Sequence, residues 1–145
     1  MARLFGRTYT RAELLERVGD ITQVAGARSF LFRDGRAAGL EAIHVYNGSG
    51  LEFDILAGRA LDLGQACYRG VSLAWRSPVG DVTAPYYEPE GLGWLRSFAG
   101  GLLVSCGLTF FGAPERDRGE DLGLHGRVGN LPAEEVSVRT GWEGD

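Results

Sequence analysis

The sequence contains no lysine. All fifteen of its basic residues are arginine, and they stand against nineteen acidic residues. The formal net charge is −4, and the arginines are scattered along the chain rather than clustered. A nucleic-acid surface needs a basic patch or stripe, which this chain does not have. The sequence therefore predicts no nucleic-acid partner.

Long apolar runs are missing as well. No stretch approaches the roughly 20 apolar residues that a transmembrane helix needs. The first seven residues, Met-Ala-Arg-Leu-Phe-Gly-Arg, lack the apolar core of a signal peptide. We therefore expect a cytoplasmic protein that has no membrane partner.

Cysteine and histidine are scarce, with two of each. Cys67 and Cys106 form no C-x-x-C pair, and no histidine lies at metal-ligand spacing from either. Buried free thiols in a reducing cytosol are the preferred interpretation, with a structural disulfide left open. The nucleophile elbow, the P-loop, the dinucleotide fingerprint and the zinc-protease motif are all absent. The sequence thus predicts neither a metal nor a cofactor.

Glycine, in contrast, is abundant, with 23 residues of 145, about twice the usual share. Because no repeat accompanies it, this excess indicates many tight turns and favours a β-rich chain. A chain of this length forms one domain at most, so residues 1–145 are assigned to a single domain.

Local patterns predict one helix followed by an antiparallel meander that has one solvent-exposed face. Thr10 and Glu13 fit a capping box inside an N-terminal helical extension, residues 1–19, which Gly19 is placed to end. Residues 113–121 are charged and predict a solvated loop. Alternating apolar and polar residues predict strands near residues 30–32, 43–46, 51–55, 71–75 and 136–142. The last of these would leave an open C-terminal edge, which favours a homo-oligomer.

The most informative stretch is Gly123–Arg127, where glycines flank two polar side chains. His125 can bond a sugar oxygen or act as an acid or base near neutral pH, or it can simply bond loop carbonyls. Arg127 and Arg96 offer rigid forks for hydroxyl or carboxylate oxygens. Internal salt bridges with the acids of residues 115–121 are the structural alternative for both arginines.

Other candidates receive structural roles. His44 lies on the polar face of an expected strand, and we expect it to be exposed and uninvolved. Arg59 is expected to pair with Asp62 or to reach the same cleft. Four aromatic side chains could stack against a sugar ring but fit the core better: Trp94, Phe98, Phe110 and Phe111.

Five motifs in this order resemble the bacterial aldose 1-epimerase-like proteins of the galactose mutarotase superfamily. The resemblance runs from about residue 20 to the last residue. It implies an all-β antiparallel sandwich, here its N-terminal portion, that binds a free sugar in a cleft across one sheet. The motifs are Gly-Ser-Gly-Leu-Glu-Phe (48–53), Arg-Ala-Leu-Asp-Leu (59–63), Ala-Trp-Arg-Ser-Pro-Val-Gly (74–80), residues 93–108, and Gly-Leu-His-Gly-Arg-Val-Gly-Asn-Leu-Pro-Ala-Glu (123–134).

The resemblance also implies a chemistry. In the family, a base removes the anomeric hydroxyl proton and an acid protonates the ring oxygen, which interconverts the two anomers of a sugar. His125 matches the family histidine that contacts the sugar near its ring oxygen, Arg127 matches the residue after that motif, and Arg96 matches a substrate-binding arginine. Family members are about twice as long, and their catalytic glutamate and second histidine lie in the later half. No residue here, including Glu134 and Glu135, is assigned those roles.

Three functional hypotheses follow. The first is a mutarotase-like isomerase acting on a small-molecule sugar, whose catalytic base lies outside this chain. The second is a sugar-binding module without turnover. The third is a fragment that another chain completes.

Overall fold

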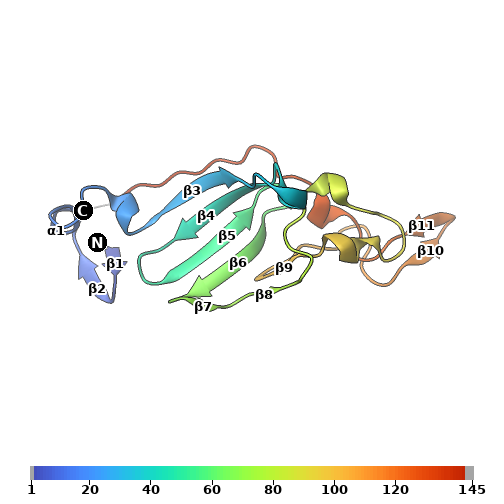
Figure 1. Ribbon diagram of the computed structural model, residues 1–145, viewed down its shortest axis with the longest axis horizontal. Helices are drawn as coiled ribbons and strands as arrows, with labels where there is room; N and C mark the ends of the chain where they lie inside the picture. The colour runs from blue at the N-terminus through green and yellow to red at the C-terminus, as the bar shows by residue number, and fades with distance from the viewer. Residues whose placement is uncertain (1, 143–145) are drawn as a thin grey trace.

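A five-stranded antiparallel sheet in the order β3-β4-β5-β6-β7 forms the centre of the molecule, so each strand pairs with its neighbour in sequence (Figure 1). A computed structural model describes residues 2–142. The turn between β4 and β5 is fixed by Asn47, whose Oδ1 accepts from the backbone N–H groups of Ser49 and Leu51 at 2.9 and 3.1 Å. The predicted all-β antiparallel architecture is confirmed, and the chain has very little helix.

The elements follow one another along the whole described chain. Their bounds are β1 Ala2–Leu4, β2 Arg7–Tyr9, α1 Arg11–Leu15, η1 Ile21–Gln23, β3 Gly26–Leu31, η2 Gly35–Ala37, β4 Glu41–Tyr46, β5 Leu51–Leu56, β6 Asp62–Tyr68, β7 Val71–Ser72, β8 Trp75–Arg76, η3 Ala84–Tyr86, η4 Gly93–Ser97, β9 Gly100–Gly101, β10 Glu115–Asp117, β11 Glu120–Leu122 and η5 Val128–Asn130, where η marks a 3-10 helix.

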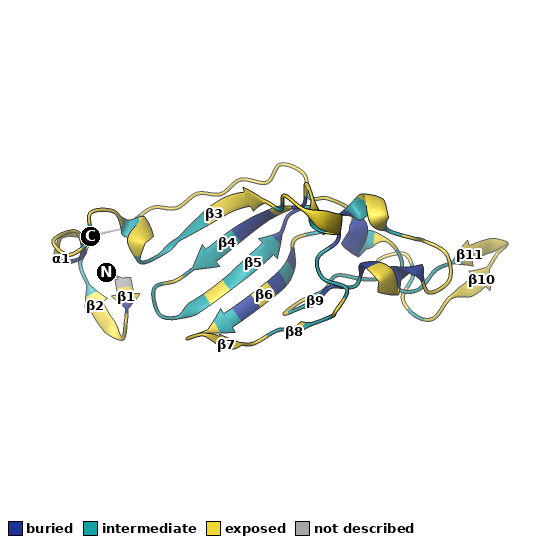
Figure 2. Cartoon of the chain, viewed as in Figure 1, coloured by how far each residue is buried: buried dark blue, intermediate teal, exposed yellow. Residues whose placement is uncertain are grey.

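The sheet buries only a small apolar core. Leu40, Ala42 and Leu56 form its buried cluster, and Phe32 packs against them. Figure 2 shows buried positions in β4, β5 and β6, whereas the outer strands β3 and β7 are mostly exposed.

Beyond β6 the chain loses regular structure. It forms short 3-10 helices and the two-stranded pair β8-β9, which joins β6 through a single bridge between Leu63 and Leu103. The charged stretch expected to be a loop forms the exposed hairpin β10-β11. These irregular segments lie at one end of the sheet and carry the candidate site (Figure 1).

The predicted capping box of the N-terminal helix is confirmed, but the helix is shorter than predicted. The Thr10 hydroxyl accepts from the Glu13 N–H while the Glu13 carboxylate accepts from the Thr10 N–H, which is the predicted capping box. The helix ends at Leu15 rather than near Gly19. A hairpin, β1-β2, precedes it. No helix in residues 2–142 is long and apolar enough to cross a membrane.

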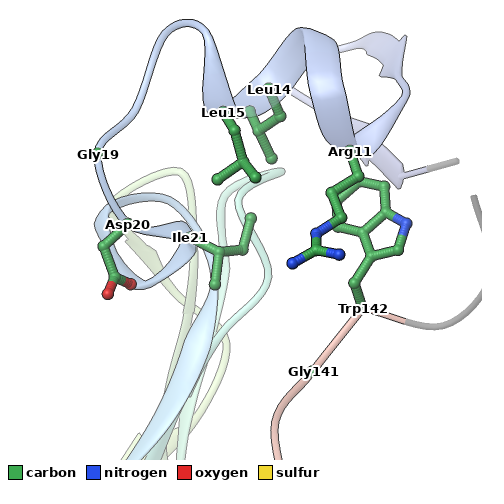
Figure 3. A pocket seen from close by; sticks show the side chains of 8 residues that line it. All are labelled: Arg11, Leu14, Leu15, Gly19, Asp20, Ile21, Gly141 and Trp142. Atoms are coloured by element: carbon green, nitrogen blue, oxygen red, sulfur yellow. The ribbon is translucent and has the colours of Figure 1, made fainter.

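The predicted strand over residues 136–142 is wrong. This stretch is extended but belongs to no strand, because no neighbouring strand offers it a hydrogen-bond ladder. Trp142 instead lies against the other end of the molecule, beside Arg11 and near Leu14 and Leu15 of α1 (Figure 3). The C-terminal strand edge that favoured self-association is therefore not formed.

Candidate functional site

His125 has a left-handed backbone, with φ at 56°. This conformation costs a non-glycine residue roughly 1–2 kcal/mol, so its surroundings must hold it. The His125 N–H donates to the Gly112 carbonyl at 3.1 Å, and its own carbonyl accepts from the Gly107 N–H at 2.8 Å. Seven other non-glycine residues in the described part of the chain also have positive φ, so this conformation has weight only together with the contacts of the side chain.

These two hydrogen bonds close the loop of residues 107–112 onto the histidine. As a result the Phe111 ring stacks on the imidazole, with centroids 5.1 Å apart. Gly126, at φ 71°, lies so close to this loop that an added Cβ would be 2.9 Å from the Phe110 carbonyl oxygen. The glycine after His125 is thus required by close backbone approach.

The glycine before the histidine is equally constrained. A Cβ on Gly123 would be 1.8 Å from the Pro89 carbonyl oxygen, and the Leu124 N–H donates to the Gly91 carbonyl at 3.0 Å. The segment therefore lies between residues 89–91 on one side and residues 107–112 on the other. This explains why the motif needs glycines on both sides of His125.

The imidazole lies between two aromatic side chains. Trp94 of η4 meets it edge to face at 5.0 Å between centroids and is buried, whereas Phe111 is 71% exposed. The His125 Nδ1 is shielded from solvent and has no hydrogen-bond partner among residues 2–142. Because buried polar atoms are almost always paired, this atom marks a place where a polar partner is expected.

A tyrosine that the sequence analysis did not select joins the site. The Tyr87 hydroxyl donates to the Gly126 carbonyl at 3.1 Å. Burial raises the pKa of Tyr87, the Arg127 charge opposes this rise, and Glu90 adds to it. Arg127 is exposed, and within the described part of the chain its guanidinium makes no hydrogen bond or ion pair. The Arg127 guanidinium is therefore available to a ligand, two residues along the chain from His125.

Arg96 lies on η4, two residues from Trp94, but its side chain is engaged. Its Nε donates to a Glu88 carboxylate oxygen at 2.9 Å. The expected structural alternative, a salt bridge, is thus formed, although the partner is Glu88 rather than an acid of residues 115–121. Within residues 2–142 no hydrogen bond joins the Arg96 guanidinium to His125.

Arg59 has the structural role that the sequence predicted, but its hydrogen bonds go to backbone carbonyls rather than to Asp62. It is buried, and its guanidinium donates to the carbonyls of Gly129, Val82 and Ser97 at 2.5, 2.8 and 3.1 Å. Burial lowers its pKa, while Asp62 and Asp81 oppose this shift. One side chain therefore connects the end of β5 to η4, to η5 and to the segment before η3.

Asp62, at the start of β6, continues this buried network. Its Oδ1 accepts from the Ser105 N–H at 2.6 Å, and burial raises its pKa. Ser97 donates through its hydroxyl to Trp94 O and to Asn130 Oδ1 at 3.1 and 3.2 Å. The backbone that carries Trp94 is thus tied to the sheet through polar side chains.

The expected exposure of His44 is corrected, whereas its expected lack of a functional role stays a prediction. Its ring is half-buried, its Nδ1 lies 2.8 Å from an Asp54 oxygen, and it stacks on Tyr46 with centroids 5.8 Å apart. The two partners face each other because β4 and β5 pair His44 with Asp54. Folding the two expected strands about Asn47 would have revealed this pair from the sequence.

The remaining aromatic and cysteine expectations are mixed. Trp94 is buried as expected, but Phe111 is not. Cys67 and Cys106 are free thiols, as preferred, but both are half-buried rather than buried. In the described residues no three histidine, cysteine, aspartate or glutamate side chains gather closely enough to hold a metal ion.

Comparison with solved structures gives a clear fold relative. The crystal structure of a protein from Klebsiella pneumoniae subsp. pneumoniae MGH 78578, named a "putative aldose 1-epimerase", superposes with a TM-score of 0.68 at 25% sequence identity. The match covers 77% of this chain and 32% of that chain, so our chain spans about a third of its relative. No curated protein matches the sequence significantly. Residues 37–145 match the family described as "Domain of unknown function (DUF4432)", and the chain belongs to that family.

Proposed function

We propose that the chain is the sugar-binding part of an aldose 1-epimerase-like isomerase, which interconverts the anomers of a free sugar. The observation that carries this proposal is His125: a strained histidine between Trp94 and an exposed Phe111, with a buried ring nitrogen that has no partner. The likeness to a structure named an aldose 1-epimerase adds support.

The site chemistry suits a pyranose. The exposed Phe111 ring offers a flat apolar surface to the C–H face of a sugar, and the adjacent imidazole offers a polar edge. The imidazole group in general gains and loses a proton near neutral pH. This chemistry suits His125 to the role of the acid that protonates the ring oxygen. Arg127 supplies a donor fork for sugar hydroxyls. We assign the base that accepts the anomeric proton to no residue of this chain.

The test is anomeric exchange measured by NMR on a panel of free aldoses, with catalytic amounts of protein. Because this chain is assigned no base, we expect the wild-type chain to broaden the sugar signals without accelerating exchange, and the broadening to be lost in His125→Gln. His44→Gln is the matched control, because it removes the only other histidine and leaves the site intact.

Each outcome separates the hypotheses. Line broadening that depends on His125, without faster exchange, supports the sugar-binding part. Accelerated exchange would contradict the assignment of the base to no residue of this chain. Broadening that persists in His125→Gln would remove this residue from the site, and no effect with any aldose would contradict the sugar site.

A further inference from the structure

The peptide between Gly126 and Arg127 determines how two candidate site residues lie relative to each other. His125 comes directly before Gly126, and Arg127 comes directly after it. Gly126 has φ at 71°, and a glycine turns about its backbone bonds more freely than any other residue. Whatever holds the Gly126 carbonyl therefore sets the direction in which the chain leaves His125 and carries the Arg127 guanidinium.

The Tyr87 hydroxyl holds that carbonyl. It donates to the Gly126 oxygen at 3.1 Å in a half-buried position. Within the described part of the chain, no other donor reaches this oxygen, and the Arg127 N–H has no acceptor. The hydrogen bonds to the loop of residues 107–112 hold only the two peptides on either side of His125. The orientation of the next peptide along the chain thus depends on Tyr87.

The backbone of Tyr87 is itself fixed, which suits it to this role. Its N–H donates to the Ala84 carbonyl at 2.9 Å, and this hydrogen bond closes η3. Just before η3, the Thr83 N–H donates to the Arg36 carbonyl at 2.9 Å, which ties η3 to η2. The tyrosine side chain therefore extends from an anchored turn rather than from a free loop.

The environment of the hydroxyl keeps it a hydrogen-bond donor. Burial raises the pKa of Tyr87, so the side chain holds its proton more firmly than an exposed tyrosine does. The Arg127 charge acts on the same hydroxyl and opposes this rise in pKa. The Arg127 guanidinium is thus close enough to the hydroxyl to influence it, on the far side of the peptide that the hydroxyl holds.

We propose that Tyr87 is a positioning residue of the candidate sugar site. By holding the Gly126 carbonyl, its hydroxyl places the Arg127 guanidinium relative to the His125 imidazole, so that both groups reach one ligand. Tyr87 acts through Arg127 rather than by touching the ligand. This inference rests on the proposed function for the ligand, a free aldose, and adds to it the residue that aligns the two polar groups.

The first test removes the hydroxyl and keeps the ring. Tyr87→Phe should weaken the binding of free aldoses about fivefold, which is the effect of losing one neutral hydrogen bond. Tyr86→Phe is the matched control, because Tyr86 is 54% exposed and donates no hydrogen bond from its side chain within residues 2–142. Aldose titration followed by NMR measures both affinities. Equal affinity of Tyr87→Phe and the wild type would overturn the proposal.

A double-mutant cycle tests whether Tyr87 acts through Arg127. Arg127→Met alone should weaken aldose binding at least as much as Tyr87→Phe does, because it removes the group that is positioned. Adding Tyr87→Phe to Arg127→Met should then change the affinity by less than about twofold. Losses that multiply independently would overturn the proposal. An Arg127→Met chain that binds aldoses as the wild type does would also overturn it, and this result does not depend on the folding of Tyr87→Phe.

A measurement without sugar separates the failure of this proposal from the failure of the proposed function. In sugar-free Tyr87→Phe, the backbone amide signal of Arg127 and the ring signals of His125 should shift, whereas the ring signals of His44 should not. Tyr86→Phe should shift none of them. If the wild type binds no aldose, the proposed function fails, and shifted Arg127 and His125 signals still support the positioning role. Unshifted Arg127 and His125 signals in Tyr87→Phe would overturn that role, whether or not the chain binds sugar.

Discussion

The central sheet and the segments that carry His125 are ordered by different means. In β3 to β6 the strands are six or seven residues long, and backbone pairing links each one to the next. From residue 77 to 131 the elements are two to five residues long. There, buried polar side chains and close glycine contacts fix the chain. The comparison teaches that single side chains matter far more in the second region than in the first.

The largest expected effect comes from removing Arg59. Arg59→Met leaves the carbonyls of Gly129, Val82 and Ser97 without their donor, which we expect to cost about 3–5 kcal/mol of unfolding free energy. Urea denaturation followed by tryptophan fluorescence measures this loss. Arg33→Met changes an exposed arginine and serves as the control. Equal midpoints for the two variants would contradict the account.

A methyl group beside His125 should have the next largest effect. Gly123→Ala places a Cβ against the Pro89 carbonyl, so the segment must shift, at a cost of about 2 kcal/mol. We also expect sugar binding to weaken, because His125 moves with the segment. Gly141→Ala is the matched control, since its added Cβ meets no atom within 4 Å. Thermal unfolding of both variants tests the loss of stability, and sugar titration of both variants tests the loss of affinity.

The buried network should give stability a distinctive pH dependence. Because burial raises the Asp62 pKa above its ordinary value of 3.8, the folded chain holds this proton more tightly than the unfolded chain. The stabilising contribution is full below pH 3.8 and is lost as the pH rises through the folded-state pKa. The free energy of unfolding should be measured from below pH 3.8 to above the folded-state pKa of Asp62. Over this range Asp62→Asn should gain stability relative to the wild type as the pH rises.

Asp20→Asn provides a control of opposite sign. Hydrogen bonds from the Thr22 side chain and backbone lower the pKa of Asp20, so its contribution is present above the ordinary value and is lost as the pH falls through the folded-state pKa. This variant should lose stability relative to the wild type as pH rises. The same slope in both variants would show that the buried environment of Asp62 is not the cause.

The smallest effect is expected in the sheet. His44→Ala removes a cross-strand partner of Asp54 while the β4-β5 ladder remains, so we expect a loss below about 1 kcal/mol. Denaturant unfolding in parallel with Arg59→Met sharpens the contrast between the two regions. A loss as large as that of the arginine variant would erase the distinction.

How much the sequence predicts follows the same division. The alternation of apolar and polar residues located β4 and β5 near their observed bounds, because one face of each strand is more buried than the other. The capping box located α1. The strand β6 was missed because its glycine and small residues hide the alternation, and the bulge beside Phe53 and Ile55 disturbs its register. Residues 136–142 alternate without forming a strand, since pairing depends on a neighbour that the pattern cannot supply.

The candidate site was predicted only in part. His125 and its glycines stood out because the histidine and Arg127 form a compact polar pair on a backbone with little side-chain bulk. The role of Tyr87 could not be predicted, because it reaches Gly126 across 39 residues through a single hydrogen bond. The Glu88 partner of Arg96 depends likewise on how η4 folds back on the preceding loop.

The most direct test of the sugar site is a titration of free aldoses followed through the histidine ring signals by NMR. The chain has only two histidines, so His44, held by Asp54 in the sheet, is an internal reference for His125. The account predicts that sugar shifts the His125 resonance and leaves that of His44 in place. An unchanged His125 resonance at saturating sugar, or a shift confined to His44, would contradict it.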